Sequence, residues 1–157
     1  MNSENNTYEK KSLKSFIKAN PDWNELAKDC VGFANARGGT IVIGIEDGEE
    51  LPPDNQKIPD EIVENVRIRI SELTINVGLN VSKEKASNGG EHIKIDILPS
   101  QATIASTTKD QYYIRISDQC KPVLPDELSR LYTDKPAFIW ETKVVQKIQI
   151  KDCDQEK

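Results

Sequence analysis

The sequence has few of the residues that build metal sites and nucleophilic active sites. Its 157 residues include one histidine, His92, and three cysteines, Cys30, Cys120 and Cys153. Three scattered cysteines make neither a disulfide framework nor a zinc site, and one histidine supplies neither a catalytic triad nor a metal cluster. These counts predict a protein without a bound metal, without a cofactor and without catalytic residues of these classes.

Long apolar runs are also missing. No run approaches the roughly 20 residues that span a bilayer. The N-terminus, MNSENNTYEKK, lacks the apolar centre of a signal peptide. Hydrophobic residues make up 36% of the chain and charged residues 30%, as in soluble globular proteins. We therefore expect a cytoplasmic protein that makes no use of a membrane.

Acidic residues outnumber basic residues in this chain. The chain has 21 Lys and Arg against 26 Asp and Glu, a net charge of -5. This balance counts against broad, non-specific binding of nucleic acid, which needs clustered Lys and Arg. The charge is uneven, however, since Lys10, Lys11, Lys14 and Lys18 crowd the first segment. A net acidic protein can carry a basic face, so composition neither demonstrates nor excludes a nucleic-acid partner.

The most ordered stretch is residues 22–48. Apolar residues from Trp23 to Ala34 recur at helical spacing, and the pair Gly38-Gly39 is typical of a helix end followed by a tight turn. Residues 41–45 then run almost without polar interruption, which predicts a strand covered on both faces. Gly44 within it indicates a close neighbour, and Asp47 before glycine is typical of a turn.

The rest of the chain predicts a mixed sheet. Residues 8–18 are interpreted as an edge strand, and a second helix begins at Pro59-Asp60. Strands are expected at 75–81, 92–98, 103–107 and 111–117, with a hairpin turn at 88–90 and a last helix at 126–132. This order predicts an α/β (α+β) fold in which a mixed β-sheet packs with two to three helices.

Two motifs carry a family resemblance. The run FANARGGTIVIGIEDG resembles the pattern FANxxGGxLxIGxxD of the Alba-like (AlbA) DNA-binding domain of Schlafen proteins and bacterial transcriptional regulators. Residues 112–116 resemble its second signature, an aromatic-x-Arg strand. The resemblance implies a Schlafen-type AlbA domain over 8–133. The polar composition of residues 1–7 predicts a disordered N-terminus, and the apolar composition of the tail predicts a C-terminal arm or the start of a further domain over 134–157. The family-motif positions are Glu9, Asn35, Gly38, Gly39, Gly44 and Asp47.

Some Schlafen relatives are RNA nucleases, and the resemblance implies a carboxylate trio for them. Glu9 and Asp47 match two of the three positions, but the third falls on Lys14. Several carboxylates must converge to hold a catalytic divalent metal, and a lysine among them would repel it. The sequence therefore disfavours a metal-dependent RNase, and we expect a protein that is not an enzyme.

Alternation on residues 112–116 places Tyr113 and Arg115 on one face, where they could stack bases and pair with phosphates. The alternative is an internal salt bridge of Arg115, to Asp118 or to the acidic loop after Glu46. Lys109, Arg115 and Lys121 would form a positive ridge, and the lysines of the first segment, Lys10 and Lys14 among them, are a second candidate surface.

The preferred interpretation is a nucleic-acid-binding module of a transcriptional-regulator-like protein, with DNA or RNA as the partner. The first alternative is a protein-interaction domain without a nucleic-acid role, which dimerises through the apolar C-terminal arm around Trp140. The second alternative is the disfavoured RNase.

Overall fold

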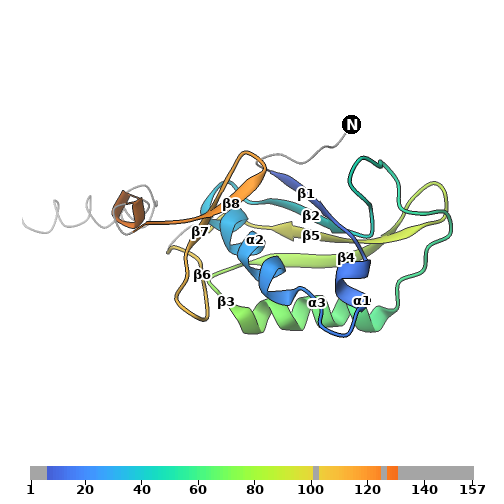
Figure 1. Ribbon diagram of the computed structural model, residues 1–157, viewed down its shortest axis with the longest axis horizontal. Helices are drawn as coiled ribbons and strands as arrows, with labels where there is room; N and C mark the ends of the chain where they lie inside the picture. Colours follow the sequence, from blue (N-terminus) through green and yellow to red (C-terminus); the bar gives the residue numbers. More distant parts are fainter. Residues whose placement is uncertain (1–6, 101–102, 125–126, 131–157) are drawn as a thin grey trace, which may run out of the picture. The chain divides into compact units, whose positions relative to one another are not determined.

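The computed structural model describes residues 7–100, 103–124 and 127–130 (Figure 1). The chain divides into a larger unit, residues 1–100 with 105–122, and a smaller one, residues 101–104 with 123–157. In the smaller unit residues 127–130 are helical, within the helix expected at 126–132. The expected disordered N-terminus, apart from Thr7, and the expected C-terminal arm lie outside the described residues.

The larger unit is built on a four-stranded mixed sheet, as predicted. Its strand order is β1-β2-β5-β4, with β1 parallel to β2 and the other neighbours antiparallel. The strands are β1 (Tyr8–Lys11), β2 (Gly39–Ile43), β4 (Leu79–Lys85) and β5 (Glu91–Ile97). β2 lies inside the sheet, and its Ile41, Val42 and Ile43 are all buried, which confirms the strand covered on both faces.

Three helices pack on one face of this sheet (Figure 1). They are α1 (Lys14–Ile17), α2 (Trp23–Asn35) and α3 (Asp60–Leu73). Alternate residues of β5, from Ile93 to Ile97, face the helices and join the core. None of the described helices has the length and apolarity that crossing a membrane requires.

The edge strand expected over 8–18 is correct only as far as Lys11. β1 pairs with β2 alone, and its last bond is donated by the Gly44 N–H to the Lys11 carbonyl at 2.9 Å. The chain then turns into α1, which buries Phe16 against Trp23, with ring centroids 5.3 Å apart. Aromatic burial decides this segment, because an extended chain would leave Phe16 beyond the end of the sheet.

The helix end and turn at Gly38-Gly39 are confirmed. Gly38 has φ +76, and its N–H donates to the Phe33 carbonyl at 2.7 Å, which closes the last turn of α2. A Cβ added to Gly39 would stand 2.5 Å from the Phe33 ring. Only glycine therefore lets the chain leave α2 and enter β2 this closely.

The second half of the unit holds shorter strands than the sequence predicted. Residue Asn76, at φ 65, splits the strand expected at 75–81 between β3 (Thr74–Ile75) and β4. The strand expected at 103–107 is only β6 (Ser106–Thr107), which pairs with β3. β7 (Tyr113–Ile116) turns at Ser117 into β8 (Gln119–Pro122), a strand that the sequence did not predict.

His92 lies on the sheet face opposite the helices. Its Nδ1 is buried and has no hydrogen-bond partner among the described residues, and its Nε2 lies 3.7 Å from the Glu84 carboxylate. Burial lowers the pKa of His92 below its usual range, while Glu84 acts in the opposite direction and Lys94 adds to the lowering. The imidazole is therefore neutral in the folded protein at pH 7.

We expect this imidazole to make stability depend on pH. Because the folded-state pKa is lowered, the unfolded chain takes up the proton first, so stability is lost as pH falls below about 6.5 towards the folded pKa. Urea unfolding at pH 7.5 and 5.5 should show a smaller loss for His92→Gln than for the unchanged protein. An equal loss in both proteins would contradict the assignment.

Candidate nucleic-acid interface

Arg115 lies in the interior of the larger unit. β7 places Tyr113 and Arg115 on one face, as alternation predicted, but that face packs against α2 and leaves them only 8% and 4% exposed. Nη1 of Arg115 lies 2.5 Å from Oε1 of Glu9 on β1. The expectation of an exposed Tyr-Arg face is therefore wrong. The alternative, an internal salt bridge, is correct in kind, with Glu9 as the partner in place of Asp118 or the acidic loop.

Lys11 extends this ion pair towards α2. Its Nζ lies 3.3 Å from Oε2 of Glu9 and 2.5 Å from Oδ2 of Asp29. Burial acts to lower the pKa of Lys11, but Asp29 and Glu9 outweigh burial and raise it. Two cations thus face two carboxylates, and the buried charges balance. We call Glu9, Lys11, Asp29 and Arg115 the ionic cluster.

Two uncharged side chains complete the surroundings of Arg115. Its guanidinium carbon lies 4.7 Å from the centre of the Phe33 ring, a cation–π contact. The Cys120 thiol donates to the Asp29 carbonyl at 3.8 Å, and burial raises the pKa of this thiol to about 12. Cys120 is therefore not a reactive thiolate. The ionic cluster joins β1, α2 and the β7–β8 hairpin, and its role is to hold them together.

Asn35 also has a structural role. This buried side chain donates through Nδ2 to the carbonyls of Ala105 and Tyr113, both at 2.9 Å, and its Oδ1 accepts from the Ala105 N–H at 2.8 Å. All three partners are backbone groups about 70 residues further along the chain. One side chain at the end of α2 thus fixes the segment that carries β6 and β7.

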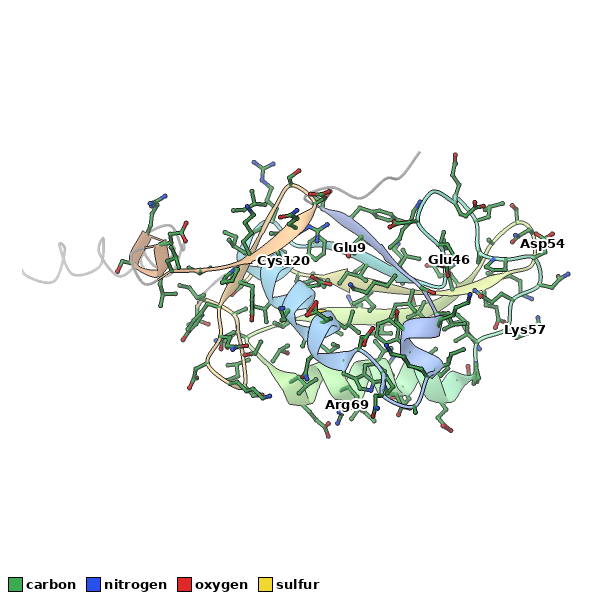
Figure 2. All side chains as sticks on the ribbon, in the orientation of Figure 1. Glu9, Glu46, Asp54, Lys57, Arg69 and Cys120 are labelled. Atoms are coloured by element: carbon green, nitrogen blue, oxygen red, sulfur yellow. The ribbon has the colours of Figure 1, made fainter. Side chains whose placement is uncertain are left out.

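The carboxylates implied by the nuclease resemblance do not converge. Glu9 points into the ionic cluster, Lys14 is exposed at the start of α1, and Asp47 is exposed in the loop after β2. Figure 2 shows Glu9 and Glu46 at separate places along the sheet. Glu46 accepts a hydrogen bond from Ser12 Oγ at 2.8 Å, away from the ionic cluster. No group of three or more His, Cys, Asp or Glu in the described ranges could hold a metal ion.

The loop that follows β2 has its own acidic hollow. Gly44, at φ +115, begins it, and the Gly44 carbonyl accepts from Gln56 Nε2 at 3.0 Å, the close neighbour that the sequence predicted. Asp47 lines a cavity of about 630 Å³ together with Glu46, Glu49 and Asp54. Carboxylates dominate its rim, so it is unsuited to phosphate.

A second cavity, of about 400 Å³, has the opposite character. Residues of α2, the end of α3 and the turn from β6 to β7 line it. Its polar and charged lining residues are Asn24, Glu25, Lys28, Thr107, Thr108, Lys109, Gln111 and Tyr113, so two cations face one carboxylate. The volume lies within the range of roughly 300–1,000 Å³ that small-molecule sites occupy. We call this cavity the lysine pocket; Lys109 and Tyr113 are the sequence-predicted residues that it brings together.

Lys28 is the cation of the lysine pocket that sequence reasoning missed. Its Nζ lies 5.2 Å from the centre of the Tyr113 ring and 2.9 Å from Glu25. The hydrogen bond with Glu25 raises the pKa of Lys28, against a smaller opposing effect of burial, so the ammonium is charged. In the sequence Lys28 is one half of an i,i+3 pair, a pattern typical of any solvated helix face.

The remaining predicted cations lie elsewhere. Lys121 is exposed on β8 opposite Ile114, and Lys10 on β1 donates to the carbonyl of Glu49. Lys14 is exposed on α1, where its backbone N–H donates to Ser12 Oγ at 3.2 Å. None of these three residues lines the lysine pocket. The positive ridge expected from Lys109, Arg115 and Lys121 is not formed, because Arg115 is buried.

The chain was compared with known proteins by sequence and by fold. No match was found among curated proteins. A crystal structure of the DIP2311 protein from Corynebacterium diphtheriae is similar in fold, with a TM-score of 0.56 and 20% identity over 83% of this chain and 24% of that chain. The family model described as Schlafen, AlbA_2 matches residues 4–124. This match includes both motifs, the ionic cluster and the lysine pocket, and the chain therefore belongs to the Schlafen AlbA_2 family.

Proposed function

We propose that this domain is a nucleic-acid-binding module without catalytic activity, and that the lysine pocket contacts the nucleic acid. The observation that carries the proposal is the pairing of Lys28 and Lys109 on one concave surface in a chain of net negative charge. Family membership supports a nucleic acid as the partner, and the lysine pocket is the contact site that we propose for it.

The pocket chemistry fits a phosphate-bearing polymer. Lys109 is exposed, and its ammonium has no ion-pair partner among the described residues, so phosphate need not compete for it. Lys28 is held in place by the Tyr113 ring and by a partly exposed ion pair with Glu25, and a phosphate has to displace or share that weak pair. Asn24 and Gln111 add amide groups that can reach sugars or base edges.

Two lysines predict modest, salt-sensitive affinity. For a single strand each neutralised phosphate contributes about 0.7 to the slope of log affinity against log salt, so raising salt from roughly 50 to 200 mM should weaken binding about sevenfold. Fluorescence anisotropy with labelled single-stranded DNA, duplex DNA and RNA measures this slope. Lys28→Gln with Lys109→Gln should remove most of it and weaken low-salt binding about tenfold.

Lys57→Gln is the matched control, since Lys57 is an exposed lysine in the loop before α3 and does not line the lysine pocket (Figure 2). A control variant that weakens binding as much as the pocket variants would show that general charge, not this site, binds the polymer. Shortening of an RNA probe in Mg²⁺ that Asp47→Ala abolishes would overturn the non-catalytic proposal.

A further inference from the structure

We propose that Asn88 is a modification site: it loses its amide by deamidation, and the resulting aspartate releases the turn between β4 and β5 from the loop that precedes α3. Asn88 is the only asparagine in the chain that is followed by glycine. Its side chain makes three hydrogen bonds, and two of them need the NH₂ group that deamidation removes. Asn88 does not line the lysine pocket, so this site is independent of the proposed nucleic-acid site.

The Asn88 side chain joins the turn to the loop. Its Nδ2 donates to the Pro52 carbonyl at 2.7 Å and to Oδ1 of Asp54 at 2.8 Å, and its Oδ1 accepts from the Gly90 N–H at 3.0 Å. Figure 2 shows Asp54 beside this turn. The backbone carbonyl of Asn88 also accepts from the Asn55 N–H at 3.4 Å. We call Pro52, Asp54 and Asn88 the hairpin clasp.

The turn itself requires the residue pair Asn88-Gly89. Gly89 has φ +81, and a Cβ added to it would stand 2.6 Å from Oδ1 of Asn55, so only glycine fits. Position 88 needs a short side chain that both donates and accepts hydrogen bonds, and asparagine supplies both. As a result, no side chain on Gly89 shields its nitrogen from the amide carbon of Asn88.

Deamidation begins when the Gly89 nitrogen attacks Cγ of Asn88. The new N–Cγ bond closes a succinimide ring, the Cγ–Nδ2 bond breaks, and Nδ2 leaves as ammonia with the proton of the Gly89 nitrogen. Water then opens the ring at either carbonyl and gives aspartate or isoaspartate. In the closed clasp the Gly89 N–H donates to the Ala86 carbonyl at 3.0 Å and the Asn88 amide is bound, so the reaction proceeds when this surface turn opens locally.

The product cannot close the clasp again. A carboxylate at position 88 has no hydrogen to donate, so the Pro52 carbonyl loses its partner and the Asp54 carboxylate meets a like charge. The cavity that Asn88 lines already has four carboxylates, those of Glu46, Asp47, Glu49 and Asp54. Because ammonia is lost to solvent, the release of the turn is irreversible.

The first test is the rate of deamidation at position 88, followed by peptide mass spectrometry during incubation at mildly alkaline pH. Asp54→Ala removes one partner of the amide without changing either reacting residue, so the clasp should open more often and the reaction should run about tenfold faster. Glu49→Ala is the matched control, since it removes a carboxylate of the same cavity that makes no bond with Asn88. Absence of the product, or equal rates in all three proteins, would overturn the proposal.

The second test measures the consequence in Asn88→Asp, which carries the product from the start. Hydrogen exchange of the Asn55 amide should quicken about tenfold, because this N–H bonds across the clasp. Adding Asp54→Asn places an amide beside the new carboxylate and should slow the exchange again, whereas adding Glu49→Gln should not. Unchanged exchange in Asn88→Asp, or an equal effect of the two added changes, would show that deamidation does not release the turn.

Discussion

Replacing Arg115 by methionine should destabilise the domain by about 3–5 kcal/mol, the usual result of removing one partner from a buried ion pair. The Arg115 side chain is 1% exposed and that of Glu9 is 14% exposed, so water cannot take the place of the lost guanidinium. Because whole domains are stable by only about 5–15 kcal/mol, this single change should lower the melting temperature markedly. Chemical denaturation followed by circular dichroism measures the loss.

The double variant Glu9→Leu with Arg115→Met is the informative control. It removes both charges together, and Lys11 retains Asp29 at 2.5 Å. We expect it to be more stable than the sum of the two single losses predicts, since no unpaired charge is left in the interior. Additive losses would mean that Glu9 and Arg115 act independently, and would contradict the ionic cluster as a unit.

Asn35→Ala should cost about 3 kcal/mol or more, the second large effect. The change leaves the Ala105 N–H and the carbonyls of Ala105 and Tyr113 without their partner, and each buried unsatisfied group costs roughly 1–3 kcal/mol. The segment it holds carries Lys109, Gln111 and Tyr113, so binding of single-stranded probes should weaken with stability. Hydrogen exchange of the Ala105 amide should report the loosening directly.

Asn80→Ala is the matched control for Asn35→Ala. Asn80 lies exposed on β4, and its side chain makes no hydrogen bond with the described residues. The same truncation there should change stability by less than about 0.5 kcal/mol. Equal losses at the two positions would show that the three bonds of Asn35 contribute nothing beyond the general effect of losing an amide.

The residues of the motif around Asn35 make contacts that hold the fold together. Phe33 packs on Gly39 and on Arg115, Asn35 holds the β6–β7 segment, and Gly38 closes α2. The run is thus a folding motif that positions the lysine pocket, and its residues Phe33, Asn35, Gly38 and Gly39 do not line that pocket. The motif is therefore direct evidence for the fold. It bears on function only because the fold brings the residues of the lysine pocket together.

Local patterns were enough for the family and the fold class. Helical spacing of apolar residues predicted α2 and α3, alternation predicted β5, and glycine chemistry predicted the turn after α2. These features depend on neighbours within a few residues, so sequence periodicity carries them. β8 was not predicted because its four residues, Gln119–Pro122, show no alternating pattern. They form a strand only by pairing with β7 after the turn at Ser117.

The candidate site depended on contacts between distant segments. Alternation correctly placed Tyr113 and Arg115 on one face, but only packing against α2 decided that the face is buried, since a strand face has no intrinsic inside or outside. Likewise the resemblance assigned Glu9 and Asp47 to one carboxylate site. In the structure β1 pairs in parallel with β2, and Glu9 forms an ion pair with Arg115 instead. The sequence by itself thus determined the family, the fold class and the two long helices. The tertiary structure decided which charges are neutralised in the interior and which two lysines, 81 positions apart, share a pocket.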